Sequence, residues 1–251
     1  MSRRFPREDF APAPEPYFRW RGGEITRIEG FSDAVFAFAV SLLVVALEVP
    51  HSFSELVDVL RGFPGFVASF AMLYLFWSYH YRYFRRYGLE DHFTKWLNAL
   101  LLLLVLFSVY PLKFLFNQVL QGAAGMPSGA HVLGRVTPEE WGALLRIYGL
   151  GLGGIFCCYA GLYFHAFRLR AQLRLTRAEE ILTLGSIRGY GMTIGVCLFS
   201  LALVQCGWPT TAGMIYLLLI VTVPLIRRYH ERSARLAEEA WLARRAAENR
   251  R

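Results

Sequence analysis

The sequence places an arginine, a serine and an aspartate at the front of an apolar helix. Arg27 to Pro50 reads RIEGFSDAVFAFAVSLLVVALEVP, with Ser32 and Asp33 at the edge of an uncharged run. On insertion scales, a carboxylate inside a membrane helix costs about 2.5–3.5 kcal/mol unless it finds a partner or water. Asp33 therefore requires polar groups from other segments at its own depth.

Polar residues of two later segments are expected at that depth. A second apolar segment ends in FWSYHYRYFRRY, and a third begins with WLN. Because consecutive membrane spans alternate in direction, these ends should lie level with the start of the first helix. We predict a hydrogen-bonded cluster that neutralises Asp33 and anchors the first helix; the alternative is a set of independent residues that each reach water. The predicted members are Arg27, Ser32, Asp33, Trp77, His80, Arg82 and Asn98.

Residue patterns for catalysis or for metal binding are missing from the sequence. The six histidines form no H-E-x-x-H or H-x-x-x-H pair, and no P-loop, G-x-S-x-G or paired acidic motif occurs. The four cysteines form no C-x-x-C and lie in apolar runs, which is typical of small buried hydrophobic residues. We expect no enzyme activity, no metal site and no cofactor.

Composition indicates an all-α polytopic membrane protein. Hydrophobic residues make up 55% of the 251, charged residues 18%, and the mean hydropathy is +0.34. Several uncharged runs approach the roughly 20 residues that a bilayer crossing needs. The net charge of +8 comes from basic residues that flank these runs, so it favours membrane orientation over nucleic-acid binding. Residues 1–25 contain no apolar signal-peptide core and are expected to form a flexible tail.

Six membrane spans are expected, and together they form one transmembrane domain, residues 26–226. Ser52 and Glu55 resemble a capping box that opens a short helix between the first two spans, and Pro111 and Lys113 should close the third. Residues 227–251 are expected to form a basic amphipathic helix in the cytoplasm, with a solvated face or a contact with anionic lipids. The spans are 27–49, 64–83, 93–112, 141–167, 184–205 and 212–226.

Charge distribution predicts the orientation, and glycines predict the helix contacts. With both termini in the cytoplasm, 23 of the 27 Lys and Arg residues lie on the cytoplasmic side. Small residues recur along the fourth and fifth spans, which allows close helix approach. They are Gly149, Gly153, Cys157 and Gly161, followed by Gly185, Gly189, Gly191 and Gly195.

Beyond Asp33, the first helix carries an apolar stripe with a single hydroxyl. Phe38, Ser41, Leu42, Val45 and Val49 follow a helical repeat. Periodicity cannot decide whether the stripe faces lipid, protein or a pore, because the helix is apolar all round. Taken alone, the pattern favours a lipid-facing or core face.

The motif from Arg27 through Phe31, Ser32 and Asp33, with the apolar run after it, resembles the first helix of the transmembrane-protein-175 family of potassium channels. FWSYHYRYFRRY is similar to the family's second helix, and WLNALLLLLVLFSVYPLKF to its third. The resemblance implies a single six-helix repeat that assembles as a homotetramer in a bacterial cell membrane. The first helices would line a pore whose constriction is made of apolar side chains.

When the first-helix motif is aligned with that of the family, the resemblance implies pore rings at Phe38, Leu42 and Val45, with the hydroxyl of Ser41 beside them. Family members typically carry Ile or Leu where this chain has Phe38, so the selectivity among K⁺, Na⁺ and H⁺ is an open question. The implied function is a potassium-permeable channel in contact with membrane lipids and without nucleic acid. Two alternatives stay open: a proton pathway or secondary transporter that uses Asp33 and His80, and a non-conducting scaffold.

Overall fold

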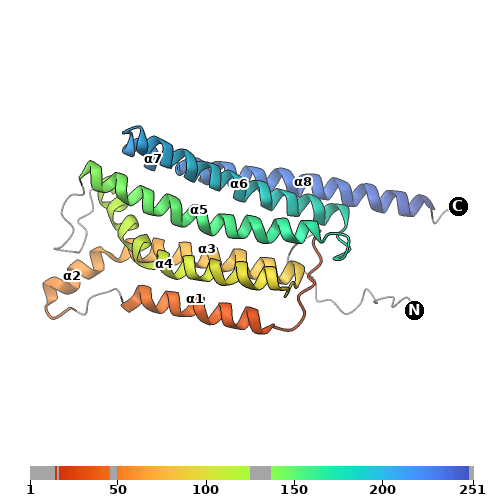
Figure 1. Cartoon of the computed structure of the whole chain (residues 1–251), viewed down its shortest axis with the longest axis horizontal. Coiled ribbons are helices and arrows are strands. Elements are labelled where there is room, and N and C mark those ends of the chain that lie inside the picture. The colour runs from red at the N-terminus through yellow and green to blue at the C-terminus, as the bar shows by residue number, and fades with distance from the viewer. Residues whose placement is uncertain (1–14, 16, 46–49, 125–136, 249–251) are drawn as a thin grey trace.

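The computed structural model describes residues 15, 17–45, 50–124 and 137–248. Apart from short connections, these residues are helical (Figure 1). The helices are α1 (Arg27–Val45), α2 (Phe53–Arg61), α3 (Phe63–Tyr87), α4 (His92–Ala124), α5 (Pro138–Arg168), α6 (Arg177–Gln205), α7 (Pro209–Met214) and α8 (Leu217–Glu248).

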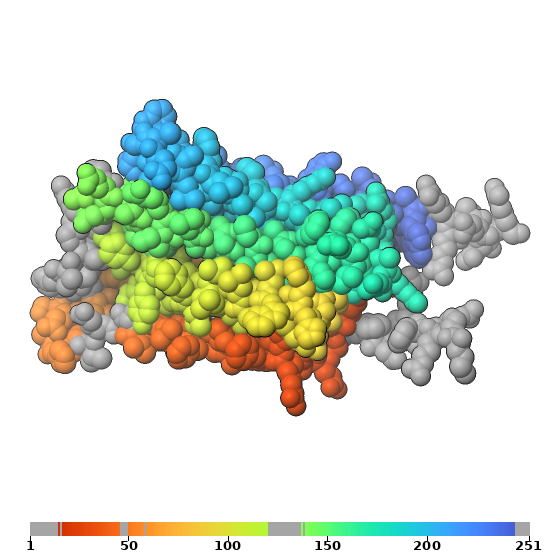
Figure 2. All heavy atoms as spheres, in the orientation of Figure 1, coloured from red at the N-terminus to blue at the C-terminus, as the bar shows by residue number. Residues whose placement is uncertain are grey.

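The long helices run side by side in one bundle. α1 packs on α3 and α4, α4 packs on α5, α5 on α6, and α6 on α8. The first turn of α1 and the last described turns of α8 lie at the same end of the bundle (Figure 1). Figure 2 shows α1 along one edge of this bundle, on the side away from α7 and α8.

Length and composition support a multi-pass membrane protein. Within the described ranges, five helical segments are long and apolar enough to span a bilayer. A sixth results if α2 and α3, which meet at a bend of 44°, count as one broken span. The aromatic and basic end of α3 lowers the hydropathy of that helix, which explains why it does not qualify by itself.

Two helices extend beyond the predicted limits. The third span was predicted to close at Pro111 and Lys113, but α4 continues through both to Ala124. Proline removes one backbone donor, and membrane helices tolerate it where neighbours compensate. The expected sixth span begins in α7, and its part from Leu217 onward is continuous with the C-terminal helix as α8, which passes through Pro224 without a break. The predicted end of the first span, residues 46–49, lies outside the described residues.

Part of the N-terminal region lies against the bundle. The backbone N–H groups of Arg21 and Gly22 donate to the carbonyl of Arg85, at 3.0 and 3.1 Å. The Arg21 guanidinium pairs with the buried carboxylate of Glu179 at 2.7 Å. Phe18 is 2% exposed and packs edge-on against Tyr87. Residues 18–22, which lie within the predicted flexible tail, are therefore held against the bundle.

The predicted small-residue contacts hold for some glycines and fail for others. A Cβ atom at Gly161 would lie 2.9 Å from Leu97, and one at Gly185 would lie 2.6 Å from His230. At Gly189, Gly191 and Gly195 no atom lies within 4 Å of such a carbon, so these three do not serve close packing within the protomer. Among the cysteines, Cys158 and Cys197 are buried as expected, whereas Cys157 and Cys206 are exposed.

The approach of α8 to α6 at Gly185 can be tested by mutation. A methyl group in Gly185→Ala would lie 2.6 Å from the ring of His230, which is held by hydrogen bonds to Arg188 and Ile226. We expect a lower thermal midpoint of the purified protein. Gly189→Ala, one turn further along α6, gains up to about 1 kcal/mol of helix propensity without a clash. A thermal midpoint of Gly185→Ala equal to or above that of the wild type would contradict the close packing of α8 on α6.

Candidate functional site

A buried polar chain joins α1, α4 and α3. The hydroxyl of Ser32 donates to its own helix at the carbonyl of Ile28, 2.7 Å away. The amide of Asn98 donates to the Ser32 hydroxyl at 2.9 Å, and its oxygen lies 2.9 Å from Nε2 of His80. Because the Asn98 oxygen can only accept, Nε2 of His80 carries the hydrogen.

These three side chains are almost completely removed from solvent. Ser32, His80 and Asn98 are 0%, 1% and 2% exposed, and the imidazole packs against the rings of Phe36 and Phe84. Leaving a buried donor or acceptor unpaired costs about 1–3 kcal/mol. The hydrogen bonds therefore restrict α1 to one rotation about its own axis.

Asp33 has a separate partner. The indole Nε1 of Trp77 donates to its carboxylate at 2.8 Å, and Trp77 stacks on Tyr81 with ring centroids 5.4 Å apart. Asp33 is exposed in the protomer. The predicted cluster thus divides into a buried chain at Ser32 and an exposed pair at Asp33.

Other predicted members lie apart from both groups. Arg27 is exposed, and Phe31 is 62% exposed. Arg82 forms an ion pair with Glu15 at 2.9 Å and is not a partner of Asp33. The expectation that Arg82 joins Asp33 is wrong, because the Arg82 guanidinium extends toward Glu15 in the N-terminal segment. The place of Arg27 in the cluster stays a prediction.

The sequence analysis missed two buried carboxylates at the same end of the bundle. Glu29 is 5% exposed, accepts from the Thr26 N–H at 3.0 Å and lies 3.5 Å from Arg85. Glu179 pairs with Arg21 and accepts from the N–H of Thr176 at 2.8 Å. Both follow a T-x-x-E pattern, which is the signature of a helix N-terminus and could have identified them.

Asp91, in the connection between α3 and α4, adds a further charge at this end. It accepts from the Thr94 N–H at 2.7 Å and lies 2.6 Å from Nε2 of His165. Partial burial raises the pKa of Asp91, but the hydrogen bonds from Thr94 and His165 outweigh burial and hold that pKa below its ordinary value. The carboxylate is therefore ionised at neutral pH.

The rotation of α1 decides which face it presents outward. Phe36, Ala39 and Leu43 are buried against α3 and α4. At about 100° per residue, Phe38, Ser41 and Val45 lie on the roughly opposite face. Phe38 is 56% exposed and Val45 74% exposed.

The remaining stripe residues differ in exposure. Leu42 is half-buried, so it lies at the border of the outward face. Ser41 is exposed, and its hydroxyl donates to the carbonyl of Ala37 at 3.1 Å. The hydroxyl is therefore satisfied within its own helix, and the outward face is otherwise apolar.

The chain is similar to several known proteins. Residues 27–110 match the family model described as endosomal/lysosomal potassium channel TMEM175. A curated protein of Marivirga tractuosa named "Potassium channel" is 36% identical over 190 residues, which cover 74% of this chain and 77% of that protein.

Two solved structures are also similar. A crystal structure of a variant of the potassium channel MtTMEM175 matches with a TM-score of 0.76 and 32% identity, covering 87% of this chain and 98% of the other. A structure described as a lysosomal potassium-selective channel TMEM175 homolog from Chamaesiphon minutus matches with a TM-score of 0.52 and 26% identity. That match covers 80% of this chain and 96% of the other.

The buried chain predicts a specific loss of stability. His80→Ala leaves the Asn98 oxygen without its donor and opens a void beside Phe36, so we expect destabilisation by about 3 kcal/mol. The measurement is the thermal midpoint of the purified protein. His92→Ala, which removes an exposed histidine at the start of α4, is the matched control and should leave the midpoint unchanged. Equal midpoints for the two variants would show that the buried chain does not anchor α1.

Proposed function

Because the chain belongs to the TMEM175 family of potassium channels, we propose that it is a potassium-permeable channel whose pore is lined by α1 from four subunits. The observation that carries the proposal is the outward face of α1, with Phe38, Ser41 and Val45 directed away from the core of the protomer. We place the protein in the bacterial cell membrane, as a multi-pass protein.

The position of α1 supports an axial role. Among the described helices, α1 contacts mainly α3 and α4, and it lies at the edge of the bundle (Figure 2). A fourfold assembly through this edge would bring four copies of the Phe38 face together around one axis. The polar chain at Ser32 would then hold each copy in the rotation that the ring requires.

The proposed constriction is hydrophobic. Rings of Phe38, Val45 and, at the border, Leu42 offer no oxygen ligands that could replace the hydration shell of an ion. Such a constriction gates by dewetting, so conduction requires that side chains rotate or helices separate. A lower dehydration cost would favour K⁺ over Na⁺, and the faces of the Phe38 rings can attract a cation.

The transporter alternative is not favoured. Asp33 and His80 take separate partners, Trp77 and Asn98, and no hydrogen bond joins the two in the described structure. Coupled proton relays typically use several ionisable groups along one pathway. The family relatives reported above are named potassium channels, and we assign the same class of function here.

Shortening Phe38 tests the constriction. In liposomes with a K⁺ gradient, Phe38→Ala should raise K⁺ flux several-fold because the apolar barrier widens, and Phe38→Ile should retain a preference for K⁺ over Na⁺. Phe199→Ala is the matched control, because Phe199 on α6 is also 56% exposed in the protomer. It should leave flux unchanged.

Absence of flux for both the wild type and Phe38→Ala, in correctly assembled protein, would refute the channel proposal. An equal effect of Phe199→Ala would show that Phe38 is not the constriction. A current that fails to reverse at the K⁺ equilibrium potential would instead support a coupled carrier.

Four symmetric thiols would report whether Ser41 lies on the axis. In a background without the four native cysteines, we expect Ser41→Cys to make K⁺ flux sensitive to micromolar Cd²⁺, because adjacent thiolates bind this soft ion together. Ser233→Cys on α8 is the control: its hydroxyl also bonds a carbonyl one turn earlier, at Tyr229. Cd²⁺ insensitivity of Ser41→Cys channels would remove Ser41 from the pore.

A further inference from the structure

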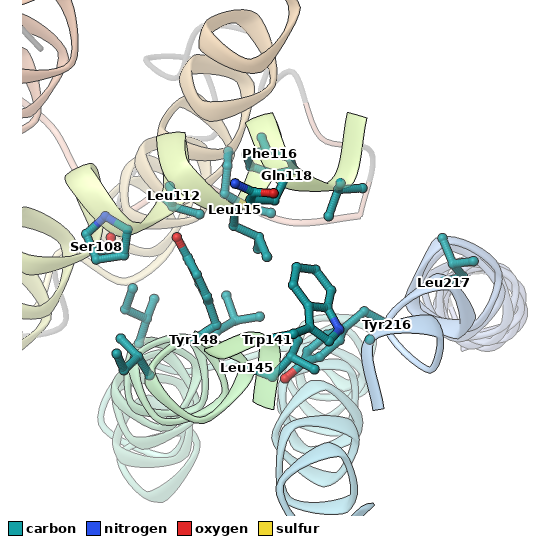
Figure 3. A pocket seen from close by; sticks show the side chains of 18 of the residues that line it. Ser108, Leu112, Leu115, Phe116, Gln118, Trp141, Leu145, Tyr148, Tyr216 and Leu217 are labelled. Carbon is teal, nitrogen blue, oxygen red and sulfur yellow. The ribbon is translucent and has the colours of Figure 1, made fainter. Parts of the chain in front are cut away.

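A large cavity lies between α4, α5 and the segment of α7 and α8, and α1 contributes no residue to its lining. It has a volume of about 1020 Å³ and is enclosed by α4, α5, α7 and the start of α8, with Phe76 of α3 at its inner end. Figure 3 shows the side chains that line it, including Trp141 and Tyr148 from α5 and Gln118 from α4.

The cavity wall is mostly apolar, and several of the apolar residues that line it lie on the surface of membrane-spanning helices. Phe107, Ile147 and Ile220 line the cavity and are also exposed on the protein surface. An opening framed by such residues faces hydrocarbon. Protein interiors contain few voids larger than a water molecule, and apolar cavities of even about 150 Å³ accept apolar ligands rather than water.

Three polar groups in the wall have unused hydrogen-bonding capacity. One is the hydroxyl of Tyr216, and the other two belong to α5 and α4. Tyr148 is 8% exposed, and its hydroxyl has no hydrogen-bond acceptor among the described residues. The same holds for Nε2 of Gln118, which is also buried. Both groups can donate, and both line the cavity. A ligand that fits would therefore combine a long apolar part with a hydrogen-bond acceptor.

We propose that this cavity is a binding site for a membrane phospholipid, which inserts one acyl chain between α4, α5 and α8. An ester carbonyl of the lipid accepts hydrogen bonds from the Tyr148 hydroxyl and the Gln118 amide. Trp141, near the start of α5, stands where tryptophans commonly contact the lipid interface. The acyl chain extends deeper, along Leu152 and Ile155 toward Phe76.

The site does not depend on conduction. Its residues lie on α3, α4, α5, α7, α8 and the α7–α8 connection, whereas the proposed pore face lies on α1. Lipid binding can therefore be measured directly on the protein, and its failure would leave the channel proposal untouched.

The test uses the full chain in phospholipid vesicles. A phospholipid with a photoreactive diazirine at the end of one acyl chain is added at a low mole fraction, and crosslinked peptides are mapped by mass spectrometry. We expect labels concentrated on the cavity-lining segments of α4 and α5. Unlabelled phospholipid should compete, and free fatty acid should compete poorly.

A side chain that fills the cavity should strongly reduce crosslinking of the lipid to the cavity-lining segments. A carbon at Gly151 meets no atom within 4 Å, and Gly151 lines the cavity, so Gly151→Phe places a ring in it. Labelling of the cavity segments should fall at least about fivefold. Gly195→Phe on α6 makes the same exchange at an equally open position outside the cavity and should retain the label.

A second variant keeps the proposal testable if Gly151→Phe does not fold. Tyr148→Phe retains the ring and removes the hydroxyl, and labelling should fall about three- to tenfold, as expected for one lost hydrogen bond. Uniform labelling of all outward-facing helices, or no effect of either variant, would overturn the proposal. So would competition by fatty acid alone, or crosslinks that place a second copy of the chain in the cavity.

Discussion

The hydrogen-bonded chain of Ser32, Asn98 and His80 is the constraint on which the arrangement of α1 depends. α1 is apolar on nearly every side, so hydrophobic burial alone would accept several rotations of this helix at similar free energy. Ser32 is the residue that removes this freedom. With its hydroxyl turned toward Asn98, Phe36, Ala39 and Leu43 must face the core. A slip of one residue, about 100°, would leave the amide of Asn98 unpaired in a dry interior.

The rest of the protomer holds the partners of Ser32 in place. α3 contributes His80, whose ring packs between Phe36 and Phe84, and the following turns carry the buried tyrosines Tyr83 and Tyr87. The Tyr87 hydroxyl bonds with Thr183 of α6 at 2.7 Å, which ties this end of α3 to the far side of the bundle. The segment around Arg21 crosses the same end and pairs with Glu179. Polar contacts therefore concentrate at the end of the bundle where α1 begins.

The sequence allowed the membrane class, the helical fold and the level of the polar residues to be predicted, because hydropathy and span direction determine them. Ser32, His80 and Asn98 were placed at one depth by this reasoning, and they do meet. A shared depth in the membrane does not determine which arginines contact these three residues. Arg82 is long enough to reach Glu15, and nothing in its local pattern indicated a partner in the N-terminal segment. The predicted end at Pro111 is wrong, because a proline that ends helices in soluble proteins is tolerated in a membrane helix whose neighbours support it.

The two ends of the bundle differ in what holds them together. Where α1 begins, charged and polar side chains are paired, and opening any of them exposes groups that demand a new partner. Around the cavity, residues of α4, α5 and α8 line a common, mostly apolar space, and such regions open at lower free energy than tightly packed ones. The outward face of α1 at Phe38 and Val45 lies beyond the polar anchor, where no hydrogen bond to another helix is described. Movement of the proposed pore would thus pivot about Ser32, because the polar end is the one that cannot shift without breaking hydrogen bonds.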